Sequence, residues 1–434
     1  MPIARAAKRA TARLGAVVLT GALLAACGSG ASPDSADGAG GKVTLTVDLF
    51  GSFGFKEAGL YEEYQQLHPH VTVKQSDTQD EADYWKSLQT RLAGGGGLAD
   101  VQGVEVGRIA SVTQQQSDKF HDLKAFGADK LKSQFAEAKW SAATTKDGKI
   151  LGLGTDVGPE AMCYRTDLFQ QAGLPTDREE LAKKWSTWEG YLELGKEYKK
   201  KAPAQSAWLD SIGSLYGIMI GQEKERYYNA SGEMIYEKNP AVRTAWDTSV
   251  KAAEAGLSAK LDQWSPQWNQ AFAAGSFATI PCPAWMLGYV KAQAGAAGQG
   301  KWDIAKLPGG AGNWGGSYLS IPRAAKHKEE AYKLIEWLTA PEQQAKVFQK
   351  QGNFPSSTGT IAKIADAKDP YFSGAPIGRI FGDAAKESPV QVLGVHDQNV
   401  MQQLTNALGE VERKGVSSET AWETAKKGVA NVTG

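Results

Sequence analysis

Apolar positions change their spacing repeatedly along the chain from residue 42 onward. Residues 42–49 and 71–73 alternate apolar with polar positions, and residues 98–104 form a third apolar run, so three strands are predicted. Residues 60–67 and 84–92 carry apolar residues at the 3.6-residue spacing of amphipathic helices. This β-α-β-α-β order predicts an α/β fold on an open, mainly parallel sheet.

Ligands of such sheets bind beyond the carboxyl ends of the strands. The first and third strands run into segments 50–55 and 105–108, so Phe53, Glu105 and Arg108 are candidate ligand contacts. Each has an ordinary alternative role. Phe53 could pack on the next helix, Glu105 could cap a helix, and Arg108 could be a solvated ion-pair partner.

Residues 150–175 are predicted to connect two structural halves of the chain. An apolar strand, 150–153, leads into Gly154, Thr155 and Asp156, and a second apolar stretch begins after Gly158. A carboxylate between two buried strands, beside glycines that let the backbone bend, suits a crossing between two lobes. Asp156 is therefore a candidate ligand contact, with a strand-end cap as the alternative.

The second half of the chain is mostly helical in pattern. Residues 272–285 repeat the strand-to-turn pattern of a crossing, and a Gly-rich turn at 308–317 precedes another strand. Apolar residues at 331, 334, 335 and 338 predict a helix, and two amphipathic helices end the chain, the last starting near Ser417 or Ser418. The order implies discontinuous lobes.

Composition fits a large globular protein, with 434 residues, 42% hydrophobic and 22% charged. The formal net charge is zero, and without the four basic residues of the leader 44 basic residues face 48 acidic ones, a net charge of −4. The sequence contains no basic stripe of the kind that would indicate nucleic-acid binding.

The first 26 residues have a basic start and an apolar run from Leu14 to Ala26, which is the shape of a secretory signal peptide. The run is shorter than the ~20 residues of a membrane span. Residues 27–41 are rich in Gly, Ser, Ala and Asp and predict a flexible tether that begins at Cys27.

Catalytic and metal-binding motifs are scarce. The sequence contains neither Gly-x-Ser-x-Gly nor His-Glu-x-x-His, and the Gly94–Gly97 run lacks the Gly-Lys-Ser/Thr of a phosphate loop. The pair His68 and His70 is interpreted as a solvated helix end rather than a metal site. A glycoside hydrolase stays open because 48 acidic residues offer many carboxylate pairs.

Aromatic residues favour carbohydrate binding. The chain has 13 Trp, several of them in Gly- or Pro-rich turns. Indole planes cover the C–H face of a sugar, while carboxylates and amides bond its hydroxyls. Further candidate contacts are Trp208, Asp210, Trp268, Asn269, Trp285, Trp314 and Asn353. The alternatives are core packing for the Trp residues and backbone hydrogen bonding for the Asn residues.

Residues 150–175 and 280–285 together resemble family 1 extracellular solute-binding proteins, the sugar-binding subunits of bacterial ABC importers. The resemblance extends over nearly all of the chain after the leader, and the segments Ala161–Arg165 and Ile280–Trp285 are similar to actinobacterial oligosaccharide binders. It implies a two-lobed, type II periplasmic-binding-protein-like fold whose discontinuous lobes are joined by a three-crossing hinge.

The expected lobe boundaries follow from that resemblance. The N-terminal lobe is predicted to comprise 42–155 plus 281–325, and the C-terminal lobe 156–280 plus 326–434. The three crossings are expected near 154–158, 278–282 and 320–326. The resemblance also places a sugar-stacking Trp at position 285.

The same resemblance implies how the protein works. Leu24 to Cys27 resembles a lipobox, so Cys27 is expected to carry a lipid, palmitate included, that anchors the protein at the outer face of the cell membrane. The implied partners are an oligosaccharide, a permease and its ATPase, with a monomeric binder, no enzymatic activity, no cofactor and no metal.

The loop at 103–108 lacks the aromatic residue that some maltodextrin binders carry, so a β-linked cello- or xylo-oligosaccharide is the preferred ligand. The alternatives are a surface glycoside hydrolase and a binder of another solute such as a peptide.

Besides Cys27, the chain has two cysteines, Cys163 and Cys282. In the resembled fold both lie on strands that run through the hinge region. A disulfide suits the oxidising compartment, and two buried free thiols are the alternative.

Overall fold

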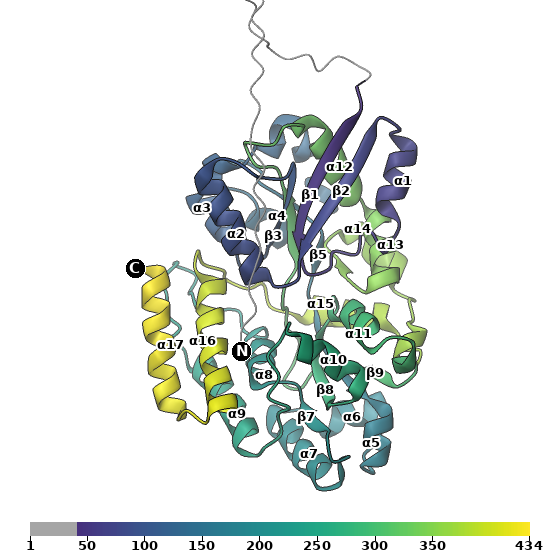
Figure 1. Ribbon diagram of the computed structural model, residues 1–434, viewed down its shortest axis with the longest axis vertical. Helices are drawn as coiled ribbons and strands as arrows, with labels where there is room; N and C mark the ends of the chain where they lie inside the picture. Colours follow the sequence, from purple (N-terminus) through teal and green to yellow (C-terminus); the bar gives the residue numbers. More distant parts are fainter. Residues whose placement is uncertain (1–40) are drawn as a thin grey trace, which may run out of the picture. The chain divides into compact units, whose positions relative to one another are not determined.

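The computed structural model describes residues 41–434, of which Lys42–Gly434 form one compact unit (Figure 1). The predicted signal peptide, most of the tether and the predicted lipidation site Cys27 lie outside the described residues. None of the helices in the described part is both long and apolar enough to span a membrane.

The first lobe is built on a five-stranded sheet in the order β2-β1-β3-β10-β4. Its strands are β1 (Val43–Phe50), β2 (Val71–Thr78), β3 (Val101–Glu105), β4 (Leu153–Gly154) and β10 (Ser317–Ser320). β1 runs parallel to β2 and β3, while β10 is antiparallel to β3 and β4. The predicted mainly parallel sheet is thus confirmed, with β10 returning from far along the chain.

Apolar side chains on both faces of this sheet are covered by helices. The helices of the lobe are α1 (Leu60–Leu67), α2 (Glu81–Gly94), α3 (Ile109–Gln115), α4 (Glu137–Ala142) and α12 (Lys328–Leu338). Leu319 packs with α1 and α12 on one face, and its neighbour Tyr318 packs with α2 and α3 on the other. The period of two in the strands therefore fixes which helices share a core.

The second lobe is built on a four-stranded sheet in the order β7-β8-β6-β9. Its strands are β6 (Glu160–Arg165), β7 (Ala207–Leu209), β8 (Phe277–Pro283) and β9 (Trp302–Ala305). Every residue of β6 and β8 is buried, because helices cover both faces. Figure 1 shows this sheet among α6, α7, α8, α10 and α11.

In the part of the chain that the structure describes, twelve α-helices surround this second sheet or connect it to the first. They are α5 (Thr166–Gln171), α6 (Arg178–Lys184), α7 (Trp188–Lys201), α8 (Ile212–Ile220), α9 (Pro240–Glu254), α10 (Pro266–Ala274), α11 (Met286–Ala294), α13 (Pro341–Gln351), α14 (Thr358–Ile364), α15 (Ile377–Glu387), α16 (Asp397–Lys414) and α17 (Ser418–Thr433). The last helix begins as predicted, with the Ser417 hydroxyl accepting from the Thr420 N–H.

The chain passes between the two sheets three times. The first crossing, between β4 and β6, contains β5 (Asp156–Val157), which pairs with β11 (Phe354–Pro355). The second is the Gly-rich segment between β9 and β10. The third runs through α13, whose Val347 packs in the core of the first lobe and whose Phe348 packs in that of the second.

Two of the predicted crossings are therefore wrong. Residues 278–282 belong to β8, a central strand that pairs with both β6 and β7. Residues 320–326 connect β10 to α12, and both of these elements contribute to the core of the first lobe. A buried apolar run bounded by turns looks the same in sequence whether it is a central strand or a crossing.

The sheets also correct the predicted lobe segments at two places. α11 and β9 were expected in the N-terminal lobe, but α11 packs in a core with β6 and β8, and β9 pairs with β6 in the second sheet. α12 was expected in the C-terminal lobe but packs on the first sheet.

Cys163 and Cys282 form a disulfide between the neighbouring strands β6 and β8, with a Cα–Cα distance of 5.4 Å. Both residues are fully buried. The bond therefore ties two strands of one sheet rather than linking the lobes.

Removing this disulfide should destabilise the protein, since it closes a loop with a sequence separation of 119. The double variant Cys163→Ala/Cys282→Ala is expected to lose about 2–5 kcal/mol of unfolding free energy, measured by urea denaturation. Reducing agent should lower the stability of the parent protein and leave that of the variant unchanged. Equal stability of both proteins would contradict the prediction.

Candidate ligand-binding cavity

A cavity of about 560 Å³ lies between the two lobes. The first lobe contributes the turn after β1, the amino end of α2 and Glu105 at the end of β3. The second lobe contributes Trp264, the start of α11 and one face of α16. The crossings supply Asp156, residues 314–317 and Asn353.

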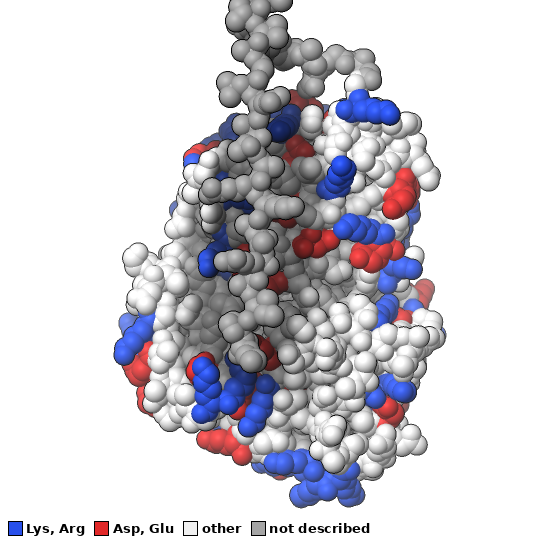
Figure 2. Space-filling model, viewed as in Figure 1, with Lys and Arg blue, Asp and Glu red and all other residues white. Residues whose placement is uncertain are grey.

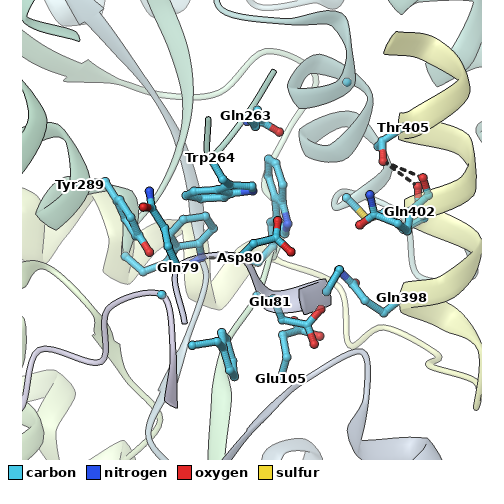
Figure 3. A pocket seen from close by; sticks show the side chains of 18 of the residues that line it. Gln79, Asp80, Glu81, Glu105, Gln263, Trp264, Tyr289, Gln398, Gln402 and Thr405 are labelled. Atoms are coloured by element: carbon cyan, nitrogen blue, oxygen red, sulfur yellow. Dashed lines mark hydrogen bonds between the residues drawn. The ribbon is translucent and has the colours of Figure 1, made fainter. Parts of the chain in front are cut away.

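One wall of the cavity is aromatic. Trp285 precedes α11 and Tyr289 follows one turn later, so both lie on one face of that helix. The ring centroid of Trp264 lies 6.0 Å from that of Trp285 and 5.2 Å from that of Tyr289, and Trp314 is 6.0 Å from Trp285. All four rings are partly exposed, and Figure 3 shows Trp264 and Tyr289 beside the cavity.

Glycines at the crossings let this wall assemble. The Trp285 indole N–H donates to the carbonyl of Trp314 at 2.7 Å. A Cβ on Gly158 would lie 1.8 Å from that carbonyl oxygen, and Gly315 has a φ of +90°. Only glycine fits at position 158, where any side chain would clash with the carbonyl. Glycine is strongly favoured at position 315 because φ is positive there.

The amino end of α2 contributes three carboxylates to the cavity lining, those of Asp80, Glu81 and Asp83. Asp80 caps the helix, its side chain accepting from the Asp83 N–H at 2.9 Å. Glu81 receives two hydrogen bonds from Arg108, each 3.1 Å long. In Figure 3 Asp80, Glu81 and Glu105 follow one another below Trp264.

Glu105 has an unusual proton affinity. Burial raises its pKa to about 8, and the nearby charge of Glu81 adds to the rise. The Gly107 N–H donates to its carboxylate. Glu105 therefore holds its proton at neutral pH and can donate to a ligand as well as accept from one.

Asp156 is fixed by the backbone of β10. Its Oδ1 accepts from the Ser317 N–H at 2.9 Å and from the Thr155 hydroxyl at 2.8 Å. Burial raises its pKa, while the nearby Lys139 lowers it. Lys139 lies behind the wall with its Nζ 3.8 Å from the centroid of the Tyr318 ring, and burial lowers the pKa of this lysine to about 8.

Six of the residues selected from the sequence line this cavity. They are Phe53, Glu105, Asp156, Trp285, Trp314 and Asn353. They come from six separate stretches of chain, which the fold brings together.

Five selected residues lie elsewhere. Trp208 is buried in the core of the second lobe, stacked 5.3 Å from Phe169. Asp210 and Trp268 are fully buried partners, with the Trp268 indole N–H donating to Asp210 at 2.9 Å. Their predicted ligand contacts are thus wrong, because aromatic packing and an internal hydrogen bond already satisfy these side chains.

The other two corrections lie beside the cavity. Arg108 stands behind Glu81 as its ion-pair partner and also donates to Asn399 on α16. Asn269 lies on α10 outside the lining, where its Oδ1 accepts from Gln79 at 3.4 Å. Arg108 therefore orients a lining carboxylate instead of facing a ligand.

The polar face of α16 was not predicted to contact a ligand. Gln398, Gln402 and Thr405 point from this helix toward the cavity (Figure 3), and Asn406 and Arg413 complete the stripe. Their spacing of three, four and seven residues marks one helix face, opposite the buried Leu404 and Leu408. That stripe is visible in the sequence, but a polar helix face is ordinarily a solvated one. Also missed as contacts were Gln79, Asp80, Glu81, Asp83, Asp262, Gln263, Trp264, Tyr289, Met401 and Glu412.

Within residues 41–434, no cluster of three or more His, Cys, Asp or Glu residues is placed to hold a metal ion. On the face shown in Figure 2, basic and acidic side chains are interspersed.

The chain is similar in sequence to bacterial extracellular solute-binding proteins. The sequence profile described as "Bacterial extracellular solute-binding protein" matches residues 59–372. A lactose-binding protein of Rhizobium radiobacter is 29% identical over 355 residues, covering 78% of this chain and 80% of that protein. An arabinooligosaccharide-binding protein of Bacillus subtilis is 24% identical over 335 residues, 73% of each chain.

Solved structures agree with this match. A crystal structure of an extracellular solute-binding protein of family 1 is 43% identical, with a TM-score of 0.74 over 90% of this chain and 99% of that one. An ABC transporter-associated binding protein of B. animalis subsp. lactis in complex with β-1,6-galactobiose is 18% identical, with a TM-score of 0.75 over 89% and 97% of the two chains. The latter likeness concerns the fold alone.

The proton held by Glu105 should make stability depend on pH. The folded pKa of about 8 exceeds the unfolded value, so the stabilising contribution is full below the unfolded pKa of ~4.3 and is lost as pH rises through 8. Glu105→Gln keeps the neutral shape at every pH. The free energy of unfolding of this variant, measured in urea, should equal that of the parent protein near pH 4.5 and exceed it by ~1–3 kcal/mol at pH 8.5. A difference that does not vary with pH would contradict this assignment.

Proposed function

The chain belongs to the bacterial extracellular solute-binding proteins, and we propose from that premise that it captures an oligosaccharide for an ABC importer. The observation that carries the proposal is the cavity, in which an aromatic wall from one lobe faces carboxylates and amides from both lobes. Its volume of about 560 Å³ is typical of sites that bury small ligands.

Each part of the cavity has a function in this proposal. Trp264, Trp285 and Trp314 offer flat apolar surfaces for the C–H faces of sugar rings. Asp80, Glu105 and the glutamines of α16 offer acceptors and donors for hydroxyl groups. A site that pairs each hydroxyl discriminates strongly against analogues that lack one.

The lobes are expected to close on the ligand. The cavity takes side chains from both lobes, so a bound sugar gains its full set of contacts only when the lobes come together. Closure about the three crossings then produces the form that docks on a membrane permease driven by a separate ATPase. The protein itself carries out no chemical step.

The ligand is proposed to be β-linked, of the cello- or xylo-oligosaccharide type. The end of β3 and the loop after it support this choice, because they contribute the carboxyl group of Glu105 and no aromatic ring to the cavity. The related proteins named above bind lactose and arabinooligosaccharides. Lipidation of Cys27 and attachment to the outer face of the membrane belong to the same proposal.

Titration calorimetry against cello-, xylo- and malto-oligosaccharides tests the proposed function. Trp285→Ala is expected to weaken binding at least tenfold, about 1.4 kcal/mol, because one face of the sugar loses its aromatic cover. The matched control is Trp337→Ala, which removes another partly buried Trp, on α12 and outside the cavity lining. It should leave the dissociation constant within about twofold. No binding in any sugar series, or equal losses in both variants, would overturn the proposal.

A further inference from the structure

The cavity is much longer than it is wide. Its lining on α16 begins at Gln398, ends at Arg413 and includes side chains from every turn between them. Because an α-helix rises ~1.5 Å per residue, this lining extends about 22 Å along the helix. A round cavity with the same volume of about 560 Å³ would be only about 10 Å across. The cavity is therefore a groove that follows α16.

This groove continues well beyond the contact between the lobes. Trp314 and Met401 are neighbours, because a Cβ on Gly217 would lie 3.0 Å from both side chains. The lining continues from Met401 to Arg413, so the groove extends about 18 Å along α16 beyond the level of Trp314. A ligand that reaches only the first lobe and Trp314 would leave this length unused.

The far end of the groove lies between the last turns of α16, residues 406–413, and the loop 260–264. The guanidinium of Arg413 lies 3.2 Å from the carboxylate of Asp262 in that loop. Below them Glu412 is only 4% exposed, and it ties the end of α16 to the second lobe. Both sides of the far end therefore belong to the second lobe.

Amide side chains line the approach to the far end. Gln402 and Asn406 stand one turn apart on α16, with the Gln402 Nε2 donating to the Asn406 Oδ1 at 2.8 Å. In Figure 3 Gln263 and Thr405 lie at the end of the cavity away from Glu105. Amides and hydroxyls both donate and accept hydrogen bonds, which suits the hydroxyl groups of a sugar.

The loop 260–264 has a costly backbone conformation. In the described part of the chain three residues other than glycine have a positive φ, and two lie in this loop, Lys260 at 58° and Trp264 at 70°. Side chains disfavour this region because the Cβ approaches the backbone carbonyl. Such conformations concentrate at binding sites, where the surrounding structure enforces them. Here the loop presents Asp262, Gln263 and Trp264 to the groove.

The length of the groove determines what it can hold. A sugar unit in an extended chain is about as long as one helical turn, ~5.4 Å, so a groove of about 22 Å has room for about four units. A disaccharide bound against Trp285 and Glu105 would leave the polar groups of the far end to water. A longer chain would bond them.

We propose that the far end is a separate subsite for the sugar units beyond the second, and that the receptor prefers chains of three or four units to disaccharides. This inference rests on the proposed function and narrows its substrate class. One lobe alone forms the subsite, so its contacts do not depend on closure. The aromatic wall and Glu105 bind the first units, and the loop 260–264 with residues 406–413 binds the last.

Titration calorimetry with sugars of increasing length tests the proposal. The probes are cello-, xylo- and malto-oligosaccharides of two, three and four units. In the series that binds, the dissociation constant is expected to fall at least tenfold from two to four units, because the added units make hydrogen bonds that a disaccharide lacks. Equal affinity for two and four units would overturn the inference.

One variant removes a side chain of the far end. Arg413→Ala should reduce the advantage of four units over two at least fivefold and leave the affinity for the disaccharide within about twofold. The matched control is Arg243→Ala, which removes another arginine that has two carboxylate partners, Asp247 at 3.0 Å and Glu419 at 3.6 Å, outside the lining. It should leave the whole series unchanged.

A second variant blocks the far end. Gly409 leaves space beside Arg413, and a Cβ at this position would meet the guanidinium. Gly409→Leu should therefore make the longer chains bind no more tightly than the disaccharide. The control is Gly359→Leu on α14, outside the lining, where a Cβ would meet no atom closer than 3.9 Å. Circular dichroism establishes that the variants are folded, and Arg413→Ala decides the question if Gly409→Leu is not.

The outcomes separate the two proposals. A gain in affinity with length that Arg413→Ala reduces supports the subsite. Binding without a gain from length, or a variant that weakens the disaccharide and the longer chains equally, overturns the subsite and leaves oligosaccharide capture intact. Failure of all three series at every length overturns both.

Discussion

The hydrogen bond from the Trp285 indole to the carbonyl of Trp314 holds together the parts of the chain that make the cavity. It joins the start of α11 in the second lobe to the segment that returns to the first sheet. It forms only because Gly158 has no side chain, since a Cβ there would lie 1.8 Å from the same carbonyl oxygen. The crossings therefore set the positions of the aromatic wall and of Asp156.

Charge is the second constraint on this site. Carboxylates such as Asp80 are placed where closing lobes would remove water, and few cations among the lining residues offset them. The pKa of Glu105, raised by burial to about 8, is one consequence. A ligand that supplies donors relieves this cost, so ligand binding and lobe closure are expected to stabilise each other.

Buried aromatic residues show where inference from sequence fails. Trp208, Trp268 and Trp285 all follow turn-rich or amphipathic stretches, and nothing local separates them. Trp208 packs fully inside the second lobe, Trp268 donates to the buried Asp210, and Trp285 faces the cavity. Which surface an indole meets depends on the neighbours that distant segments bring to it.

Residue patterns were sufficient to predict the parallel sheet of the first lobe, the helices of the C-terminal end and the aspartate at the first crossing. These features depend on periods of two and 3.6 and on glycine positions, which are local properties. The folded chain was needed to see that β9 joins the second sheet, that α12 belongs to the first, and that Arg108 stands behind Glu81. Which strands pair and on which sheet a helix packs depend on residues far apart in the chain, because a buried apolar run fits in either sheet.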